Sequence, residues 1–248
     1  MFLDLHPITI VINLIVLGIG MTVHEFAHNY VAWKMGDPLP QKQGRLTLNP
    51  LVHINWVGWL MFAIIGFGIL GSAPISPERM RDPRRGFLAA VAAGPFSNLC
   101  LALVFALILR LGGIAVDGYY LYTVPDTIAS PLGALAAFMY AMVFWNVLLF
   151  VFNLIPLFPI DGWHIVLTLL PGSWLNRMQI PVAIQQNLRP LSEFLMRPAF
   201  KWRDWQVLSY YVFLGLIFLS FIPIAGVSPL GLLIGQPTSA IMRLLLFF

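Results

Sequence analysis

Long apolar runs are the feature that most constrains how this chain can fold. Several stretches approach or exceed the roughly 18–20 apolar residues that a helix needs to cross the core of a bilayer. Hydrophobic residues make up 59% of the 248 residues and charged residues only 10%, whereas about 25% of a soluble domain is charged. Too few polar side chains exist to cover a large soluble core. The sequence therefore predicts an all-α polytopic membrane protein.

About five to six transmembrane helices are expected. The clearest apolar runs cover 8–34, 87–111, 131–155 and 205–225, and a tail at 226–248 is a weak sixth element. Residues 54–70 are apolar but short, and three glycines interrupt them. The loose alternation in "GRLTLN" could form a short strand. We therefore expect a re-entrant or strand-like segment around residues 40–70.

These spans predict one transmembrane domain over residues 1–248, with a core at 8–170 and C-terminal membrane helices at 205–248. No soluble domain is expected at either end. The net charge of +4 comes from basic residues in short loops between apolar runs, which is the positive-inside pattern of membrane proteins. A lipid bilayer is therefore the expected surroundings, and nucleic acid is not expected as a partner.

The same charges predict an orientation. Loops 71–86 and 156–204 are basic and should face the cytoplasm, whereas 112–129 has no Lys or Arg and should face outward. Lys34, at the end of the first helix, also favours the cytoplasmic side. Residues 54–70 would then start and finish on one side of the membrane, which a single ordinary span cannot do.

One ionisable cluster lies inside the first apolar run. His24-Glu25-Phe26-Ala27-His28 is an H-E-x-x-H sequence. Ionisable side chains facing lipid cost about 2.5–3.5 kcal/mol on insertion scales, so a chance occurrence is improbable. Positions i and i+4 share one helix face, and both histidines can bind one zinc ion there. Zinc lowers the pKa of its water to about 7, and Glu25 could take the proton as general base.

A catalytic zinc needs a third protein ligand and one open position. Asp161 is the preferred third ligand, because it follows an apolar span in a segment broken by prolines, where an acidic side chain is expensive. His164, three residues later, is the alternative ligand. The other residues considered were His6, His53, Asp117 and Asp126.

Three motifs in this order resemble the site-2 protease family of intramembrane zinc metalloproteases (peptidase family M50). They are "HEFAH", "AAGPFSN" at 92–98 and "NLIPLFPIDG" at 153–162. "GRLTLNP" and "DPRRG" are similar to its compact prokaryotic branch. The resemblance implies one catalytic zinc ion and transmembrane proteins as substrates. It also implies a prokaryotic plasma membrane location, and the loop charges described above place the active site nearer the cytoplasmic side.

Carried over residue by residue, the resemblance implies zinc ligands at His24, His28 and Asp161, with Glu25 as the general base. Asn153 is implied to act in catalysis by hydrogen-bonding the substrate or the oxyanion. Asn98 is implied to lie beside the substrate. Close packing by small residues is an equally good interpretation of the segment around Asn98.

Two departures from the compact branch concern the substrate path rather than the ligands. His53-Ile54-Asn55-Trp56 replaces the usual "HIDP", and Trp163 follows Gly162 where a small residue is common. A different class of function is a membrane metal transporter or metal-binding protein that uses the same His and Asp residues. A transport path needs polar residues across the whole bilayer, and few follow Asn29 on the first helix. A catalytically inactive relative would not need Glu25.

Overall fold

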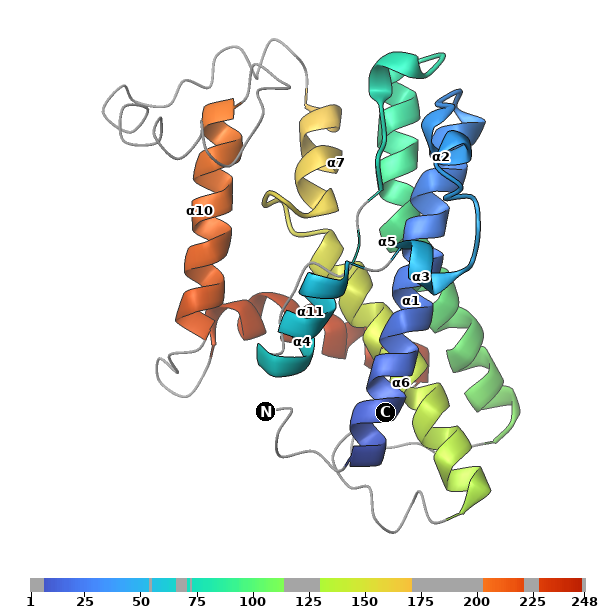
Figure 1. Cartoon of the computed structure of the whole chain (residues 1–248). Helices are drawn as coiled ribbons and strands as arrows, with labels where there is room; N and C mark the ends of the chain where they lie inside the picture. Colours follow the sequence, from blue (N-terminus) through green and yellow to red (C-terminus); the bar gives the residue numbers. More distant parts are fainter. Residues whose placement is uncertain are drawn as a thin grey trace. The chain divides into compact units, whose positions relative to one another are not determined.

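The computed structural model describes residues 7–53, 55–65, 71, 73–113, 130–170, 203–220 and 228–246, and these ranges form helices joined by turns and loops (Figure 1). The long helices are α1 (Pro7–Lys34), α5 (Pro83–Leu111), α6 (Pro131–Asn153), α10 (Arg203–Ser220) and α11 (Pro229–Leu246). The short ones are α2 (Leu39–Lys42), α3 (Pro50–His53), α4 (Trp56–Ile65), the 3-10 turn η1 (Pro77–Arg79) and α7 (Asp161–Leu169).

Helices α1, α5, α6 and α11 are long and apolar enough to cross a membrane, and α10 is a shorter apolar helix. The prediction of an all-α polytopic membrane protein is confirmed. The α5 helix begins at Pro83, four residues before the predicted start. Asp82 explains this boundary, because its side chain accepts a hydrogen bond of 3.0 Å from the Arg85 amide and Pro83 suits the first helical position.

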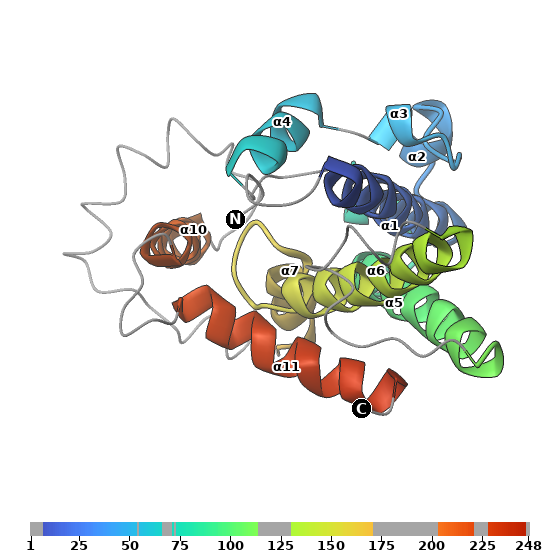
Figure 2. The same ribbon diagram turned by 90° about the horizontal axis from the view of Figure 1, so that it is seen from below.

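The fold divides into two compact units, Met1–Val151 with Pro237–Phe248, and Phe152–Gln236. In the first unit α1 packs along α5. Figure 2 shows α2, α3 and α4 on one side of α1, with α5 and α6 on its other side. Apolar contacts join α1 to α6, since Val16 packs with Ala141 and Met142, and Leu17 with Leu149. Figure 1 shows that α1 and α6 run in the same direction, since both begin at the bottom of the view and end higher up.

Residues 44–49 form turns and bends rather than the short strand that their alternation suggested. The reason is local hydrogen bonding. The Asn49 amide donates to Thr47 Oγ1, and the Leu51 amide donates to Asn49 Oδ1, which favours a turn over an extended strand. Helix α4 covers ten residues, about 15 Å, or half of a bilayer core of about 30 Å. The re-entrant path stays a prediction.

The second unit contains the end of α6, the loop 154–160, α7 and α10. Phe158 anchors this loop to α10, because its amide donates to Ser209 Oγ at 2.8 Å and its ring contacts that of Tyr210. The predicted outward loop is described only at 112–113. The basic stretch is described up to residue 170 and again from 203.

Candidate active site

The candidate site begins with one face of α1 against one face of α5. Gly20, His24 and His28 follow one another at intervals of four on α1, and Ala90, Gly94 and Asn98 do so on α5. Asn98 contacts Gly20 and His24, whereas Ala90 contacts His28. The numbers rise on one helix as they fall on the other, so α1 and α5 pack antiparallel. The i, i+4 spacing therefore aligns both histidines along the seam.

His24 is held by the carboxamide of Asn98. Its Nδ1 lies 2.7 Å from Asn98 Oδ1. The Asn98 amide nitrogen donates to the Gly20 carbonyl at 3.0 Å and to Asn146 Oδ1 at 2.8 Å. Because a carbonyl can only accept, this fixes which end of the Asn98 amide faces His24. His24 Nδ1 must carry the proton, and its Nε2 presents a lone pair.

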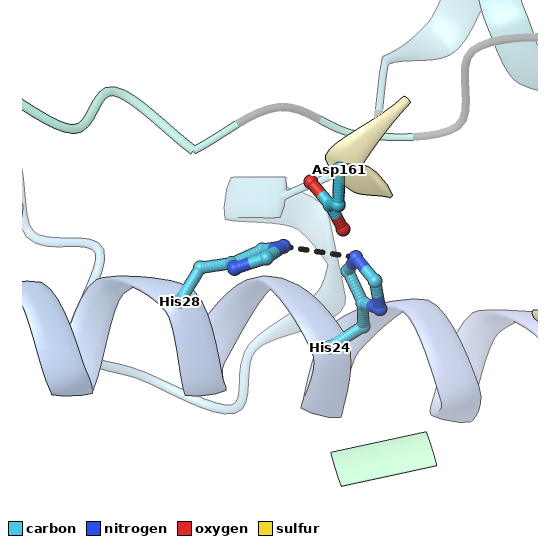
Figure 3. Close-up of side chains that lie close together, drawn as sticks. All are labelled: His24, His28 and Asp161. Carbon is cyan, nitrogen blue, oxygen red and sulfur yellow. Dashed lines mark hydrogen bonds between the residues drawn. The ribbon is translucent and has the colours of Figure 1, made fainter. Parts of the chain in front are cut away.

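His28 is held in the same tautomer by a backbone group. Its Nδ1 lies 2.8 Å from the Ala90 carbonyl, which can only accept. The Nε2 atoms of the two buried histidines lie 3.0 Å apart, along the dashed line in Figure 3. When both rings are neutral and carry their proton on Nδ1, the two Nε2 lone pairs are directed at each other. Two facing lone pairs repel, so the arrangement favours a cation shared by both rings.

Zinc fits this donor pair. Zn–N bonds of about 2.0–2.1 Å in tetrahedral geometry place two ligand nitrogens about 3.3 Å apart, close to the observed 3.0 Å. Zinc-binding histidines almost always donate the other ring N–H to a carbonyl or carboxylate, which orients the ring. Here Asn98 and the Ala90 carbonyl do this for His24 and His28 respectively.

Gly94 leaves the space that the two rings occupy. A Cβ at this position would contact His28 Nε2 and would lie 2.8 Å from His24 Cε1. No side chain can therefore stand between the α5 backbone and the histidines. Pro95 follows, buried within the helix, and removes one backbone donor there.

Glu25 lies against Gly71, whereas the two histidines lie against Gly94. It is buried, and a Cβ on Gly71 would lie 2.5 Å from its Oε1 and 2.9 Å from its Cδ. The backbone at Gly71 therefore passes directly against this carboxyl group. The predicted general base thus follows His24 in sequence and lies against the backbone at Gly71.

Asn146 was missed by the sequence interpretation. It lies on α6 and is fully buried. It accepts a hydrogen bond from Asn98, the residue that orients His24. Its one sequence signal is an amide side chain in the middle of an apolar span, which is costly without partners. Asn98 holds His24 Nδ1 and is itself held by Gly20 and Asn146, so it orients the His24 ring. The substrate contact expected for Asn98 stays a prediction.

Asp161 and Asn153 belong to the second unit. Asp161 begins α7, and Asn153 is the last residue of α6. The loop between them turns back closely. A Cβ on Gly162 would contact the Ile155 carbonyl oxygen and would lie 2.5 Å from the Leu154 carbonyl group. Glycine is therefore required after Asp161 for α7 to start against this loop. The role predicted for Asn153 stays a prediction.

The other residues considered as ligands fall in different places. His53 is buried on α3, where its Nε2 lies 2.8 Å from the Thr47 carbonyl. The His164 ring contacts that of Phe158 within the second unit. His6, Asp117 and Asp126 lie outside the described residues.

Comparisons with known proteins identify the class to which this site belongs. The model of peptidase family M50 matches residues 12–189. A Bacillus subtilis (strain 168) protein named "Putative zinc metalloprotease YwhC" is 35% identical over 167 residues, which are 67% of this chain and 73% of that protein. The Mycobacterium tuberculosis protein named "Putative zinc metalloprotease Rip2" is 26% identical over 186 residues, 73% of this chain and 59% of its own length. No solved structure matches significantly.

The chain therefore belongs to peptidase family M50. It is a zinc metalloprotease of the site-2 protease kind and an integral membrane protein, with zinc as its cofactor. The predicted family, enzyme class and cofactor are confirmed.

Proposed function

We propose that this protein hydrolyses peptide bonds in or near the transmembrane segments of other membrane proteins. The observation that carries the proposal is the buried histidine pair, with both Nε2 atoms directed at one point inside a membrane-spanning helix pair. A protease site at this depth suits a substrate that is itself embedded in the bilayer. Membership of family M50 supports the same class of substrate.

His24, His28 and Asp161 are the proposed zinc ligands. In support, the Nε2 atoms of the two histidines lie 3.0 Å apart, and Asp161 supplies a carboxylate at the start of α7. Two imidazoles and one carboxylate are a common donor set for catalytic zinc, which keeps a fourth position open. His164 is the alternative that the sequence offers for the third ligand.

Zinc, Glu25, Asn153 and Asn98 have different roles in the proposed reaction. Bound zinc supplies a Lewis acid that polarises a carbonyl and activates water. Glu25 takes a proton from the attacking water and returns it to the leaving amine, as a general acid–base group does. Asn153 donates its amide hydrogens to the substrate carbonyl, where negative charge develops. Asn98 accepts the His24 Nδ1–H and so leaves Nε2 to face the metal position. This role differs from the substrate contact that the family resemblance implied for Asn98.

The proposed orientation places the site nearer the cytoplasm of a prokaryotic plasma membrane. His28 and His24 lie six and ten residues before Lys34, about 9 and 15 Å along the helix. Lys34 ends α1 at the same end as the basic start of α5, because the Arg81 amide donates to the Met35 carbonyl. Basic residues favour the cytoplasmic side.

Cleavage of single-span membrane peptides by the purified protein in detergent tests this function. Glu25→Gln should retain zinc and lose about 10²–10⁴-fold in rate, the usual contribution of a general acid–base group. Asp161→Ala should lose zinc, whereas His164→Ala, the matched control, should keep it. Cleavage by Glu25→Gln at the wild-type rate would disprove the mechanism. Zinc loss from His164→Ala alone would reassign the third ligand.

A further inference from the structure

The starting observation is Asn146, a fully buried amide side chain near the middle of α6. Burying such a group in an apolar span costs free energy unless its donors and acceptor are satisfied. Asn146 Nδ2 donates to the Met142 carbonyl at 2.8 Å, and Asn146 Oδ1 accepts from Asn98 Nδ2 at 2.8 Å. The side chain is thus held from its own helix and directed at α5.

Donor and acceptor can be assigned for each hydrogen bond on the path from Met142 through Asn146 and Asn98 to His24. The Met142 carbonyl can only accept, so the nitrogen end of the Asn146 amide faces it and the oxygen faces Asn98. Asn98 must therefore present its nitrogen to Asn146. Its oxygen then lies 2.7 Å from His24 Nδ1. The Met142 carbonyl thus fixes which way the Asn146 carboxamide is turned, and Asn146 in turn fixes the orientation of the Asn98 carboxamide.

We propose that Asn146 is a positioning residue for zinc binding, acting through Asn98 on the ring of His24. The inference rests on the proposed role of His24 as a zinc ligand. Asn98 has a second acceptor in the Gly20 carbonyl, at 3.0 Å, so Asn146 reinforces an orientation that is partly fixed. Groups that orient metal-binding histidines change metal affinity by about 10–100-fold, and the lower end of this range applies here.

A structural role in helix packing is the competing explanation, and the chain offers a matched comparison. Asn13 on α1 is also buried and accepts from the Trp145 ring nitrogen at 2.9 Å. This bond joins α6 to α1, and its donor is the neighbour of Asn146 in sequence, whereas Asn146 itself joins α6 to α5. It has no part in the path to His24. Losing it removes a buried polar contact between the helices and leaves the His24–Asn98–Asn146 path intact.

The test is the zinc dissociation constant of the purified full chain, measured by competition with a chelator. Asn146→Leu, which is close to Asn in shape, should weaken zinc binding about tenfold. Asn146→Asp keeps an acceptor for Asn98 and should stay within about threefold of the wild type. Asn13→Leu should stay within about twofold. Asn146→Ala is a second variant that removes the amide without adding bulk, and it should weaken binding as Asn146→Leu does.

A double-mutant cycle tests whether the effect passes through Asn98. Adding Asn146→Leu to Asn98→Ala should cost no further zinc affinity, because non-additivity marks a shared path. The inference is overturned if Asn146→Leu and Asn146→Ala bind zinc as the wild type does, if Asn146→Asp weakens binding as much as Asn146→Leu, or if Asn13→Leu weakens it equally. His24→Ala separates the two proposals. If it keeps wild-type affinity, the proposed ligand set fails instead.

Discussion

At the scale of single residues, the two histidines are oriented in different ways. His28 donates to the backbone carbonyl of Ala90, which no substitution removes, whereas His24 depends on the side chain of Asn98. The structure thus makes the orientation of His24 sensitive to residues on two other helices. Gly94 affects both rings, because it lies against both.

Gly94→Ala is expected to weaken zinc binding about tenfold or more, comparable with disturbing the groups that orient the ligands. The added methyl group would contact His28 Nε2 and crowd His24 Cε1, so at least one ring must leave its position. Chelator competition on the purified variant measures the effect.

Gly215→Ala is the control, because a Cβ at this position on α10 meets nothing within 4 Å. It should leave zinc affinity unchanged and should not lower Tm, since alanine is the better helix former by about 1 kcal/mol. If Gly94→Ala bound zinc as tightly as Gly215→Ala does, the close approach of α5 to the histidines would be refuted.

At the scale of elements, the turn after α1 ties three segments together. Asp37 is fully buried, and its two carboxylate oxygens accept from the Leu39 amide at 3.0 Å and the Ser76 amide at 2.8 Å. One carboxylate therefore starts α2 and fastens the segment that leads to α5. This contact holds the end of α1, which carries the histidines, to the beginning of its packing partner.

Asp37→Ala should destabilise the protein by about 3 kcal/mol, because it removes two hydrogen bonds to a charged acceptor. For a chain of this length that lowers Tm by about 6–12 °C. Thermal unfolding in detergent measures the change.

Asp82→Ala removes a single cap at the start of α5, on a side chain that is 52% exposed. It should cost only about 1 kcal/mol. Equal shifts of Tm in Asp37→Ala and Asp82→Ala would contradict the tethering role of Asp37.

The long helices could be predicted because membrane spans are set by local composition, and the predicted start of α1 differs from the observed one by a single residue. The histidine pair followed from i, i+4 spacing alone. Asn146 could not be found in this way, since its importance depends on a partner 48 residues away. The strand suggested for residues 44–49 is absent because the Thr47 and Asn49 side chains accept hydrogen bonds from backbone amides two residues later, and these bonds outweigh a weak alternation.

At the scale of the molecule, most of the basic side chains described in the first unit lie at one end of α1 and α5, whereas Arg110 lies at the opposite end of α5. The end of α1 and the beginning of α5 meet at one end, and the basic side chains described there are Lys34, Lys42, Arg45, Arg79, Arg81, Arg84 and Arg85. The α5 helix covers 29 residues, about 43 Å, which exceeds a bilayer core of about 30 Å. The two ends of α5 are therefore expected on opposite sides of the membrane.

Cysteine labelling in intact bacterial cells tests this orientation. The variants carry Cys100→Ser, which removes the chain's one native cysteine, together with a single new cysteine. Glu78→Cys lies in exposed η1 beside the basic end, and Ser130→Cys is exposed just before α6. A membrane-impermeant maleimide should label Ser130→Cys in intact cells and Glu78→Cys only after lysis, because basic ends stay in the cytoplasm. The reverse pattern would place the site nearer the outer surface, and labelling of both in intact cells would mean that α5 does not cross the membrane.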